Sequence, residues 1–370
     1  MPRLHPRPWL VAATLLVSGC AGTTARVDPA ETALGDLPGR WENAFVDVKS
    51  GDGELRIHYL AAGPKDAPRV ILLHGFPDFA YTWRRLIPAL AGEYRVLAPD
   101  LRGYAATAKP KRGYDLDTLS ADLLAFADAT ARVDEAPEGI ATHLVGHDWG
   151  AAIGWWAVME APQRFASYTA LSVPHPQAFA DTMERSAEQR KRSRYFKTIV
   201  LPGVPTLFAS MRDKKRAALY RGELAHPDRF SDTDLVWYRT AFDTLKETRP
   251  PIRYYKERRR HATANEARAR EAAKITIPVL VLWGEQDKHL MWPMAAESCA
   301  HVEPGKCHTH VFRDAGHWPH WDAPEGVLTE WRAFIAGRPA GESAGEGGTK
   351  APEAEAAPTE DAAEPTPSAP

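Results

Sequence analysis

One ten-residue stretch, HLVGHDWGAA from His143 to Ala152, constrains the fold more than any other part of the chain. Its apolar start is typical of a buried strand, and the small residues Gly146, Gly150 and Ala151 then surround Asp148. A strand that turns sharply into a helix needs such neighbours, because the central residue has strained dihedral angles and nearby Cβ atoms would clash. The bend would lift the side chain of Asp148 into a site, so the sequence predicts a nucleophile at this position.

Apolar, β-branched runs alternate with longer helical patterns, which indicates a mostly parallel central sheet flanked by helices. From about residue 174 to 273 the strand signal disappears and the composition becomes helical, basic and aromatic. We therefore expect an α/β core at 41–173 and 274–336, with an inserted helical lid at 174–273. The expected strands are Glu54–Leu60, Val70–Leu73, Tyr94–Ala98, Thr142–Val145, Ser167–Ser172, Val279–Trp283 and Thr309–Phe312.

Chemically active residues follow several of these strands, and the carboxyl ends of parallel strands form the edge where ligands bind. A carboxylate at Asp148 is already ionised at neutral pH and can attack an sp3 carbon, forming an alkyl-enzyme ester. His317 would then activate the water that cleaves this ester, and Asp287 would accept the other imidazole N–H. Backbone N–H groups of Phe76 and Trp149 are expected to hold the oxyanion that forms when water attacks.

These motifs together resemble the α/β-hydrolase superfamily and, within it, the epoxide hydrolases. The resemblance covers roughly residues 41–336 and implies the α/β-hydrolase fold, with the chain order nucleophile, acid, histidine. It favours Asp287 over Glu285 as the partner of the histidine, because Asp287 occupies the matching place in the motif. The motifs are HGFP at His74–Pro77, GHDWGA at Gly146–Ala151, WGEQD at Trp283–Asp287 and GHWPHWDAPE at Gly316–Glu325.

Opening an epoxide leaves an alkoxide, which is a poor leaving group unless a phenol or another acid donates a proton to it. Tyr195 resembles the first lid tyrosine of the epoxide hydrolases and Tyr255 the second, with Tyr254 as its alternate. The chain departs from the family pattern here, since Arg253 and Lys256 stand where Asn and Arg are usual. We therefore expect hydrolysis of a small apolar epoxide to a vicinal diol.

Two other functions stay open at this point. Haloalkane and haloacid dehalogenases of the same superfamily share the nucleophilic aspartate, although Phe76 stands where many haloalkane dehalogenases have a halide-binding Asn. A catalytically silent surface binding protein on a hydrolase fold is the second alternative, because the loop Asp100–Thr107 departs from the usual pattern. The complete set of Asp148, Asp287 and His317 argues against a silent site.

The charge pattern speaks against a polyanionic partner. The formal net charge is −2 over 370 residues, without the basic excess typical of nucleic-acid binding. We interpret the basic runs at 185–194 and 256–260 as solvated helix faces, with attraction to anionic lipid headgroups as the alternative. No cofactor and no metal are expected, although four potential ligands cluster near His317, namely Cys307, His308, His310 and His320.

The two ends of the chain differ in composition from the body. Residues 1–19 have the charged start and short apolar core of a signal peptide, and VSGC ending at Cys20 resembles a bacterial lipobox. This predicts a lipid on Cys20, a tether at 20–40, and a protein held to the outer membrane facing the periplasm. The segment 337–370 lacks Leu, Ile, Val and aromatic residues, which predicts a disordered acidic tail whose GESAG motif is not catalytic.

Cys299 and Cys307 are the cysteines of the expected mature body. In an oxidising compartment they could close a short disulfide, and two free buried thiols are equally compatible with the sequence. The sequence does not determine the oligomeric state.

Overall fold

The computed structural model describes residues 41–51 and 53–337. The expected signal peptide, Cys20 with its tether, and the tail with its GESAG motif lie outside the described residues. Within the described ranges, no helix combines the length and the apolar character needed to cross a membrane.

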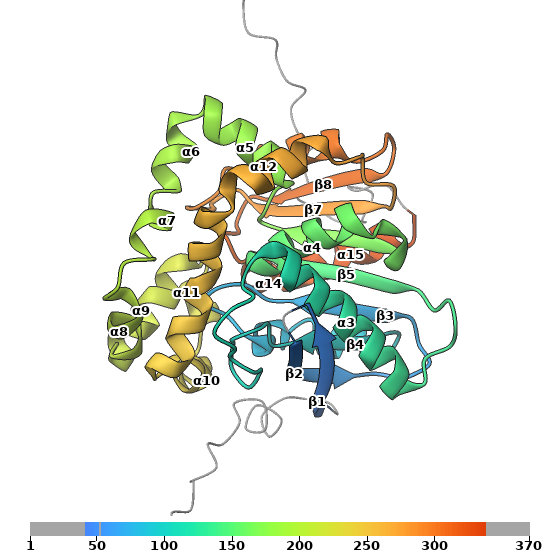
Figure 1. The fold of residues 1–370 in the computed structure, drawn as a ribbon, viewed down its shortest axis with the longest axis horizontal. Helices are drawn as coiled ribbons and strands as arrows, with labels where there is room; N and C mark the ends of the chain where they lie inside the picture. Colours follow the sequence, from blue (N-terminus) through green and yellow to red (C-terminus); the bar gives the residue numbers. More distant parts are fainter. Residues whose placement is uncertain (1–40, 52, 338–370) are drawn as a thin grey trace, which may run out of the picture.

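An eight-stranded sheet forms the centre of the molecule (Figure 1). Its order is β1-β2-β4-β3-β5-β6-β7-β8, with antiparallel pairing of β1 to β2 and of β2 to β4 and parallel pairing of all later neighbours. The predicted mostly parallel sheet is confirmed. The strands are β1 (Glu42–Ser50), β2 (Gly53–Ala62), β3 (Arg69–Leu73), β4 (Arg95–Pro99), β5 (Thr142–His147), β6 (Ser167–Leu171), β7 (Val279–Gly284) and β8 (Cys307–Phe312).

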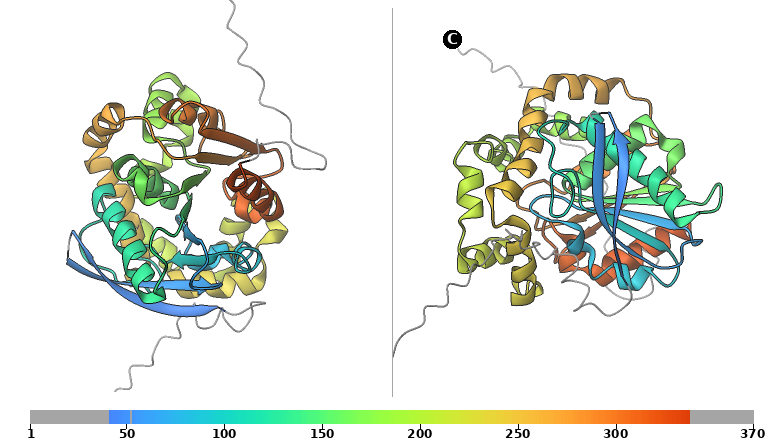
Figure 2. Two further views of the ribbon diagram at one scale, coloured as in Figure 1. Left: turned by 90° about the vertical axis from the view of Figure 1, so that its right-hand side faces the viewer. Right: turned by 60° about the horizontal axis from the view of Figure 1, so that its bottom comes forward.

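Strand β1 was not predicted from the sequence. It pairs with β2 along its whole length, from Glu42 opposite Ala61 to Ser50 opposite Gly53, and forms the edge of the sheet (Figure 2). Only Val46 and Val48 of this strand are buried. An edge strand with so few buried side chains carries little apolar alternation, and the sequence signal was correspondingly weak.

Helices cover both faces of the sheet, and β3 shows how the two cores are divided. Ile71 and Leu73 pack on the side of the helices at 116–134 and 149–160, whereas Val70 and Leu72 pack on the side of those at 87–90 and 324–335. This alternation follows from the two-residue period of a strand, and both faces are apolar because both are covered. The helices and short turns of the core are η1 (Ala80–Trp83), α2 (Ile87–Leu90), α3 (Leu116–Asp134), α4 (Trp149–Glu160), η2 (Pro162–Arg164), α13 (Met294–Ser298), η4 (Cys299–His301), α14 (Pro319–Asp322) and α15 (Pro324–Ile335).

Between β6 and β7 the chain forms helices and no strand, and these helices gather on one side of the sheet (Figure 1). Buried tyrosines attach them to the core. The hydroxyl of Tyr220 donates to the carbonyl oxygen of Pro77 (3.0 Å), and that of Tyr238 donates to Oδ1 of Asp78 (2.6 Å). The segment comprises α5 (Pro176–Arg185), α6 (Ala187–Arg192), α7 (Tyr195–Thr198), α8 (Val204–Ala209), α9 (Asp213–Glu223), η3 (Pro227–Arg229), α10 (Asp232–Phe242), α11 (Leu245–Arg260) and α12 (Ala262–Glu271), and is called the lid below.

The two cysteines of the described body are joined. Cys299 and Cys307 form a disulfide that closes the connection between η4 and the first residue of β8. Of the two alternatives that the sequence left open, the structure therefore contains the disulfide. A bridge of this kind restricts the unfolded chain and so favours the folded state.

Candidate active site

Asp148 occupies a sharp bend between β5 and α4, with φ 49° and ψ −119°. Close packing explains the glycines around it. A Cβ on Gly146 would lie 2.5 Å from the carbonyl oxygen of Gly150, and one on Gly75 would lie 2.3 Å from Cβ of Asp148. No real Cβ tolerates such distances, so the bend predicted from the small residues exists only with glycine at these places.

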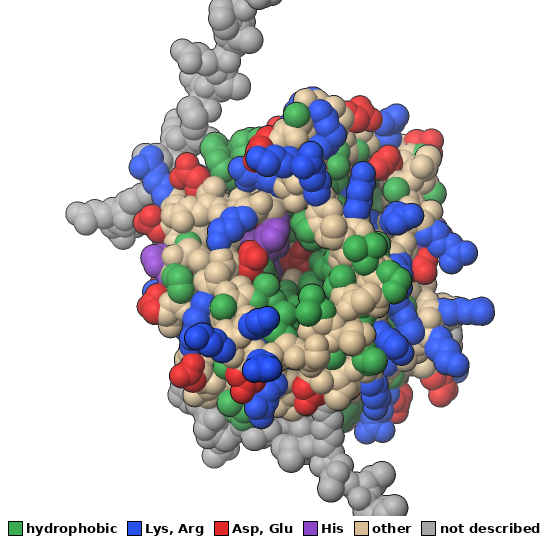
Figure 3. Space-filling view, turned by 90° about the vertical axis from the view of Figure 1, so that its left-hand side faces the viewer, with side chains coloured by type: hydrophobic (Ala, Val, Ile, Leu, Met, Phe, Trp, Pro, Cys, Tyr) green, Lys and Arg blue, Asp and Glu red, His purple; other side chains and the backbone are tan. Residues whose placement is uncertain are grey.

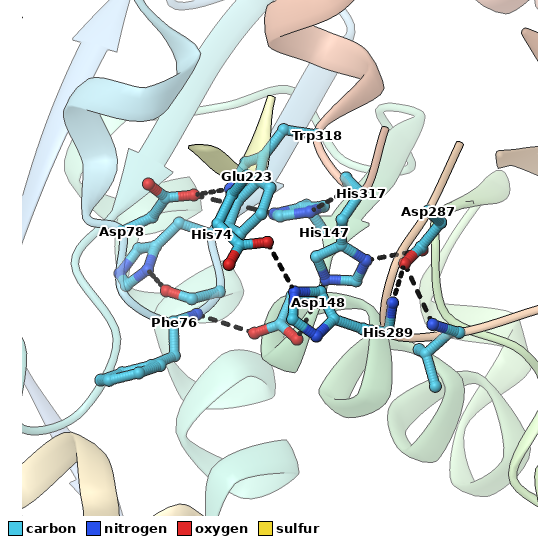
Figure 4. Close-up of polar contacts among 12 residues, drawn as sticks. His74, Phe76, Asp78, His147, Asp148, Glu223, Asp287, His289, His317 and Trp318 are labelled. Atoms are coloured by element: carbon cyan, nitrogen blue, oxygen red, sulfur yellow. Dashed lines mark hydrogen bonds and ion pairs between the residues drawn. The ribbon is translucent and has the colours of Figure 1, made fainter. Parts of the chain in front are cut away.

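The carboxylate of Asp148 has a partner for each oxygen (Figure 4). Oδ1 accepts the backbone N–H of Phe76 at 2.7 Å, and Oδ2 lies 3.5 Å from Nε2 of His317. Burial alone would raise the pKa of Asp148, but these interactions outweigh burial and hold the pKa below its ordinary value. The carboxylate is therefore ionised at neutral pH. Trp149, the other residue expected at the oxyanion site, is the first residue of α4.

Asp287 lies on the opposite side of His317 and fixes its orientation. Oδ2 of Asp287 is 2.7 Å from Nδ1 of His317, and Oδ1 accepts the backbone N–H groups of His289 (2.7 Å) and Leu290 (3.0 Å). Burial opposes ionisation of Asp287, yet the charge of His317 and these hydrogen bonds lower its pKa. Glu285 is exposed, so Asp287 is the acid that the structure places against the histidine.

Two carboxylates act on the imidazole of His317 together. Burial lowers the pKa of His317, but the charges of Asp287 and Asp148 and the hydrogen bonds to them more than compensate and raise it to about 10. The imidazole is accordingly a cation at neutral pH, with one N–H directed at each carboxylate. The resting site holds two negative charges and one positive charge in a buried space.

Asp148 also lines a cavity of about 130 Å³ between the core and the lid. Tyr195 and Tyr255 line the same cavity, with ring centroids 6.3 Å apart, and burial raises the pKa of both phenols well above the ordinary value. Both hydroxyls are therefore protonated. Figure 3 shows an opening on the lid side, with an acidic side chain visible inside it and hydrophobic side chains around it.

Tyr254, the alternate to Tyr255, lies elsewhere. Its hydroxyl donates to the carbonyl oxygen of Arg102 at 2.8 Å, and its ring packs against Tyr104 and Tyr114 in the core. Successive residues of a helix point about 100° apart, so only one of two adjacent tyrosines can face the cavity. The structure places Tyr255 there.

A second polar cluster, formed by Asp78, His147 and His320, lies behind His317 and was not predicted. Nε2–H of His147 donates to the carbonyl oxygen of His317 at 2.8 Å, which holds the loop that carries this histidine. Both oxygens of Asp78 accept hydrogen bonds, from Tyr238 and from the indole of Trp318 (2.8 Å). The sequence could have pointed to this cluster, because two of its members adjoin recognised motif residues. Asp78 directly follows HGFP, and His147 directly precedes Asp148.

Among residues 41–51 and 53–337, this cluster is the group that could hold a metal ion. One potential ligand atom from each residue lies within 4.8 Å of the others. Nδ1 of His147 and Nδ1 of His320 have no hydrogen-bond partner in these ranges. Of the ligands weighed from the sequence, His320 belongs to this cluster and the others do not. Cys307 is bound in the disulfide, and His310 faces Glu330 at 3.4 Å.

Residues 68–324 match the family model described as alpha/beta hydrolase fold. The chain is 30% identical over 312 residues to Epoxide hydrolase 2 of Caenorhabditis elegans, a match that covers 82% of this chain and 83% of the relative. The chain belongs to the α/β hydrolase fold family. Within this family it is a hydrolase of the epoxide hydrolase type, as several further relatives with that name agree.

A shorter sequence match and a solved structure also resemble this α/β hydrolase. A 123-residue stretch, 32% of the chain, is 46% identical to Epoxide hydrolase A of Mycobacterium tuberculosis and covers 36% of that protein. The crystal structure of an epoxide hydrolase from Bacillus megaterium, solved with an inhibitor, superposes with a TM-score of 0.66 at 24% identity. That superposition covers 79% of this chain and all of the other, and it shows a shared fold.

Replacing Asp148 with Asn should lower the pKa of His317, because one of the two carboxylates that stabilise the imidazolium becomes a neutral amide. In the wild-type protein the imidazole should stay protonated up to about pH 10. Nitrogen-detected NMR of histidine-labelled protein measures both titrations, and His317→Gln assigns the signal. Asp232→Asn, at an exposed position of α10, is the control. An unchanged titration in Asp148→Asn would contradict the charge arrangement described above.

Proposed function

We propose that this protein hydrolyses an epoxide to a vicinal diol through a covalent ester on Asp148. The proposal rests on one cavity lined by an ionised carboxylate and two protonated phenols, with the buried imidazolium of His317 3.5 Å from that carboxylate. The names of the relatives support the same substrate class.

In the first step, an oxygen of Asp148 attacks one carbon of the oxirane ring and the ring C–O bond breaks. The electron pair of that bond remains on the oxygen, which receives a proton from Tyr195 or Tyr255 and a hydrogen bond from the other. A phenol suits this role because it is protonated in the resting site yet acidic enough to donate. The product is a neutral alkyl ester of Asp148 and a hydroxyl on the adjacent carbon.

Formation of the ester changes the charge around His317. The imidazolium loses one of its two neighbouring carboxylates, so its pKa falls toward the range in which it can act as a base. The proton that it releases replaces the one given by the tyrosine. Neutral His317 then accepts a proton from water, and the resulting hydroxide attacks the ester carbonyl.

Breakdown of the ester completes the cycle. Backbone N–H groups of Phe76 and Trp149 hold the negative oxygen of the tetrahedral intermediate; Phe76 already donates to Oδ1 of Asp148 in the resting structure. Collapse of the intermediate expels the diol oxygen, which takes the proton from His317. Asp148 leaves this step as the carboxylic acid with one oxygen derived from water, and transfer of its proton to neutral His317 restores the resting carboxylate and imidazolium. Dehalogenation with the same aspartate remains the second candidate reaction.

A His317→Gln variant should form the ester but fail to cleave it, because no base activates water. After incubation with a terminal epoxide, mass spectrometry should show the peptide containing Asp148 heavier by the whole mass of the epoxide. Asp148→Asn is the control and should show no adduct. Bromide release from a bromoalkane by the wild type, with no adduct and no diol from the epoxide, would favour the dehalogenase and contradict the proposal.

Tyr195→Phe and Tyr255→Phe should each lower kcat, by about 10²-fold or more, because proton donation to the leaving oxygen is weakened. Tyr254→Phe is the matched control: it removes an adjacent hydroxyl that bonds to Arg102 rather than facing the cavity. Its kcat should stay within about twofold of the wild type. Equal losses in all three variants would contradict a specific role for the cavity tyrosines.

We also propose that the protein is anchored to the outer membrane, facing the periplasm, through a lipid on Cys20. The support is the VSGC sequence directly after a short apolar run. Radiolabelled palmitate should enter the wild-type protein in bacterial cells and be lost in Cys20→Ala. Label that persists in the variant would contradict the anchor.

A further inference from the structure

An arginine lies in the catalytic cavity without a role in the chemistry proposed above. Arg258 lines the cavity together with Asp148 and Tyr255. Tyr255 and Arg258 are three residues apart on α11, so they share a face of the helix and lie about 4.5 Å apart along its axis. Both side chains leave α11 on the face that borders the cavity.

Aromatic rings hold the guanidinium in place. Its central carbon lies 4.3 Å from the ring centroid of Phe196 and 5.1 Å from that of Phe179, both of which also line the cavity. Cation–π contacts of this kind orient an arginine but leave its N–H donors free for an anion. Burial lowers the pKa of Arg258, which reflects the apolar surroundings.

Arg258 has no carboxylate in ion-pair contact among the described residues. The acid that lines the same cavity, Glu266 on α12, is exposed and acts on Arg258 only through its field. A cation in an apolar cavity is unfavourable unless an anion accompanies it. The cavity lined by Asp148 thus also holds a positive group that has no ion pair with a described carboxylate.

We propose that Arg258 binds an anionic group of the substrate, and that the substrate class is an epoxide bearing a carboxylate a few bonds from the oxirane ring. The planar guanidinium matches a carboxylate in geometry, since two of its N–H groups can donate to the two oxygens. This inference rests on the proposed function and narrows its substrate.

The surface around the opening is consistent with an anionic substrate. Several Lys and Arg side chains lie above and below the hollow on the lid side, among hydrophobic and a few acidic ones (Figure 3). Basic groups near the mouth of a site raise the local concentration of anions and speed their association. Apolar walls with a single cation inside fit an apolar compound with one charged end, rather than a polyanion.

A matched pair of substrates tests the inference. The compounds 4-oxiranylbenzoate and 4-oxiranylbenzamide have nearly the same shape and differ in charge. The wild type should show a kcat/KM for the benzoate at least about 10-fold above that for the benzamide, as expected for hydrogen bonds to a charged group. Arg258→Met should reduce this preference by about 10- to 150-fold, and Arg258→Lys should reduce it less.

Arg259→Met is the control, because Arg259 is the exposed neighbour on the same helix. It should keep the wild-type preference, and circular dichroism should show all three variants folded. The inference would be overturned if the wild type showed no preference for the benzoate, or if Arg258→Met kept the wild-type preference. In either case the epoxide hydrolase proposal would stand.

A binding measurement tests the anion site independently of epoxide hydrolysis. Calorimetry with 4-ethylbenzoate, which has no epoxide and cannot react, reports the anion site alone. Binding by the wild type that weakens at least about 10-fold in Arg258→Met supports the site even if neither epoxide is hydrolysed. No binding by the wild type, or equal binding by both proteins, would overturn it.

Discussion

The close approach of two backbone bends, one after β3 and one after β5, is the constraint on which the rest of the site depends. These strands are neighbours in the sheet, with Leu73 opposite Gly146, so the residues that follow them meet at one edge. Gly75 lets the first bend touch the side chain of Asp148, and the N–H of Phe76 then reaches its carboxylate. Any larger side chain at position 75 would displace the carboxylate of Asp148.

Charge balance follows from this geometry. Once Asp148 is held at the bend, the loop after β8 brings His317 within 3.5 Å of it, and the loop after β7 brings Asp287 to the other side of the ring. The imidazole is a cation as long as both acids are ionised, and we propose that it becomes a base when one of them is esterified. In the proposed reaction, the chemistry of the first step thereby prepares the group needed for the second.

Much of this arrangement could be predicted from local patterns. The buried strands are continuous apolar runs, and β3, β5 and β7 each end in a motif that depends on residues adjacent in the chain. The edge strand β1 was missed because it buries few side chains. Only resemblance favoured Tyr255 over Tyr254, since the rotation of α11 about its axis is set by packing against Tyr104 and Trp149.

The amino-acid sequence by itself determined the bend at Asp148, the mostly parallel sheet and the order of the acidic and histidine loops, because each depends on neighbouring residues or on a short period. Tertiary structure alone decided that Cys299 and Cys307 are bonded, that His147 supports the carbonyl of His317, and that Arg258 lines the cavity against two aromatic rings with no ion pair to a described carboxylate. These are contacts between segments distant in the chain, and their geometry exists only once the sheet and the lid have packed together.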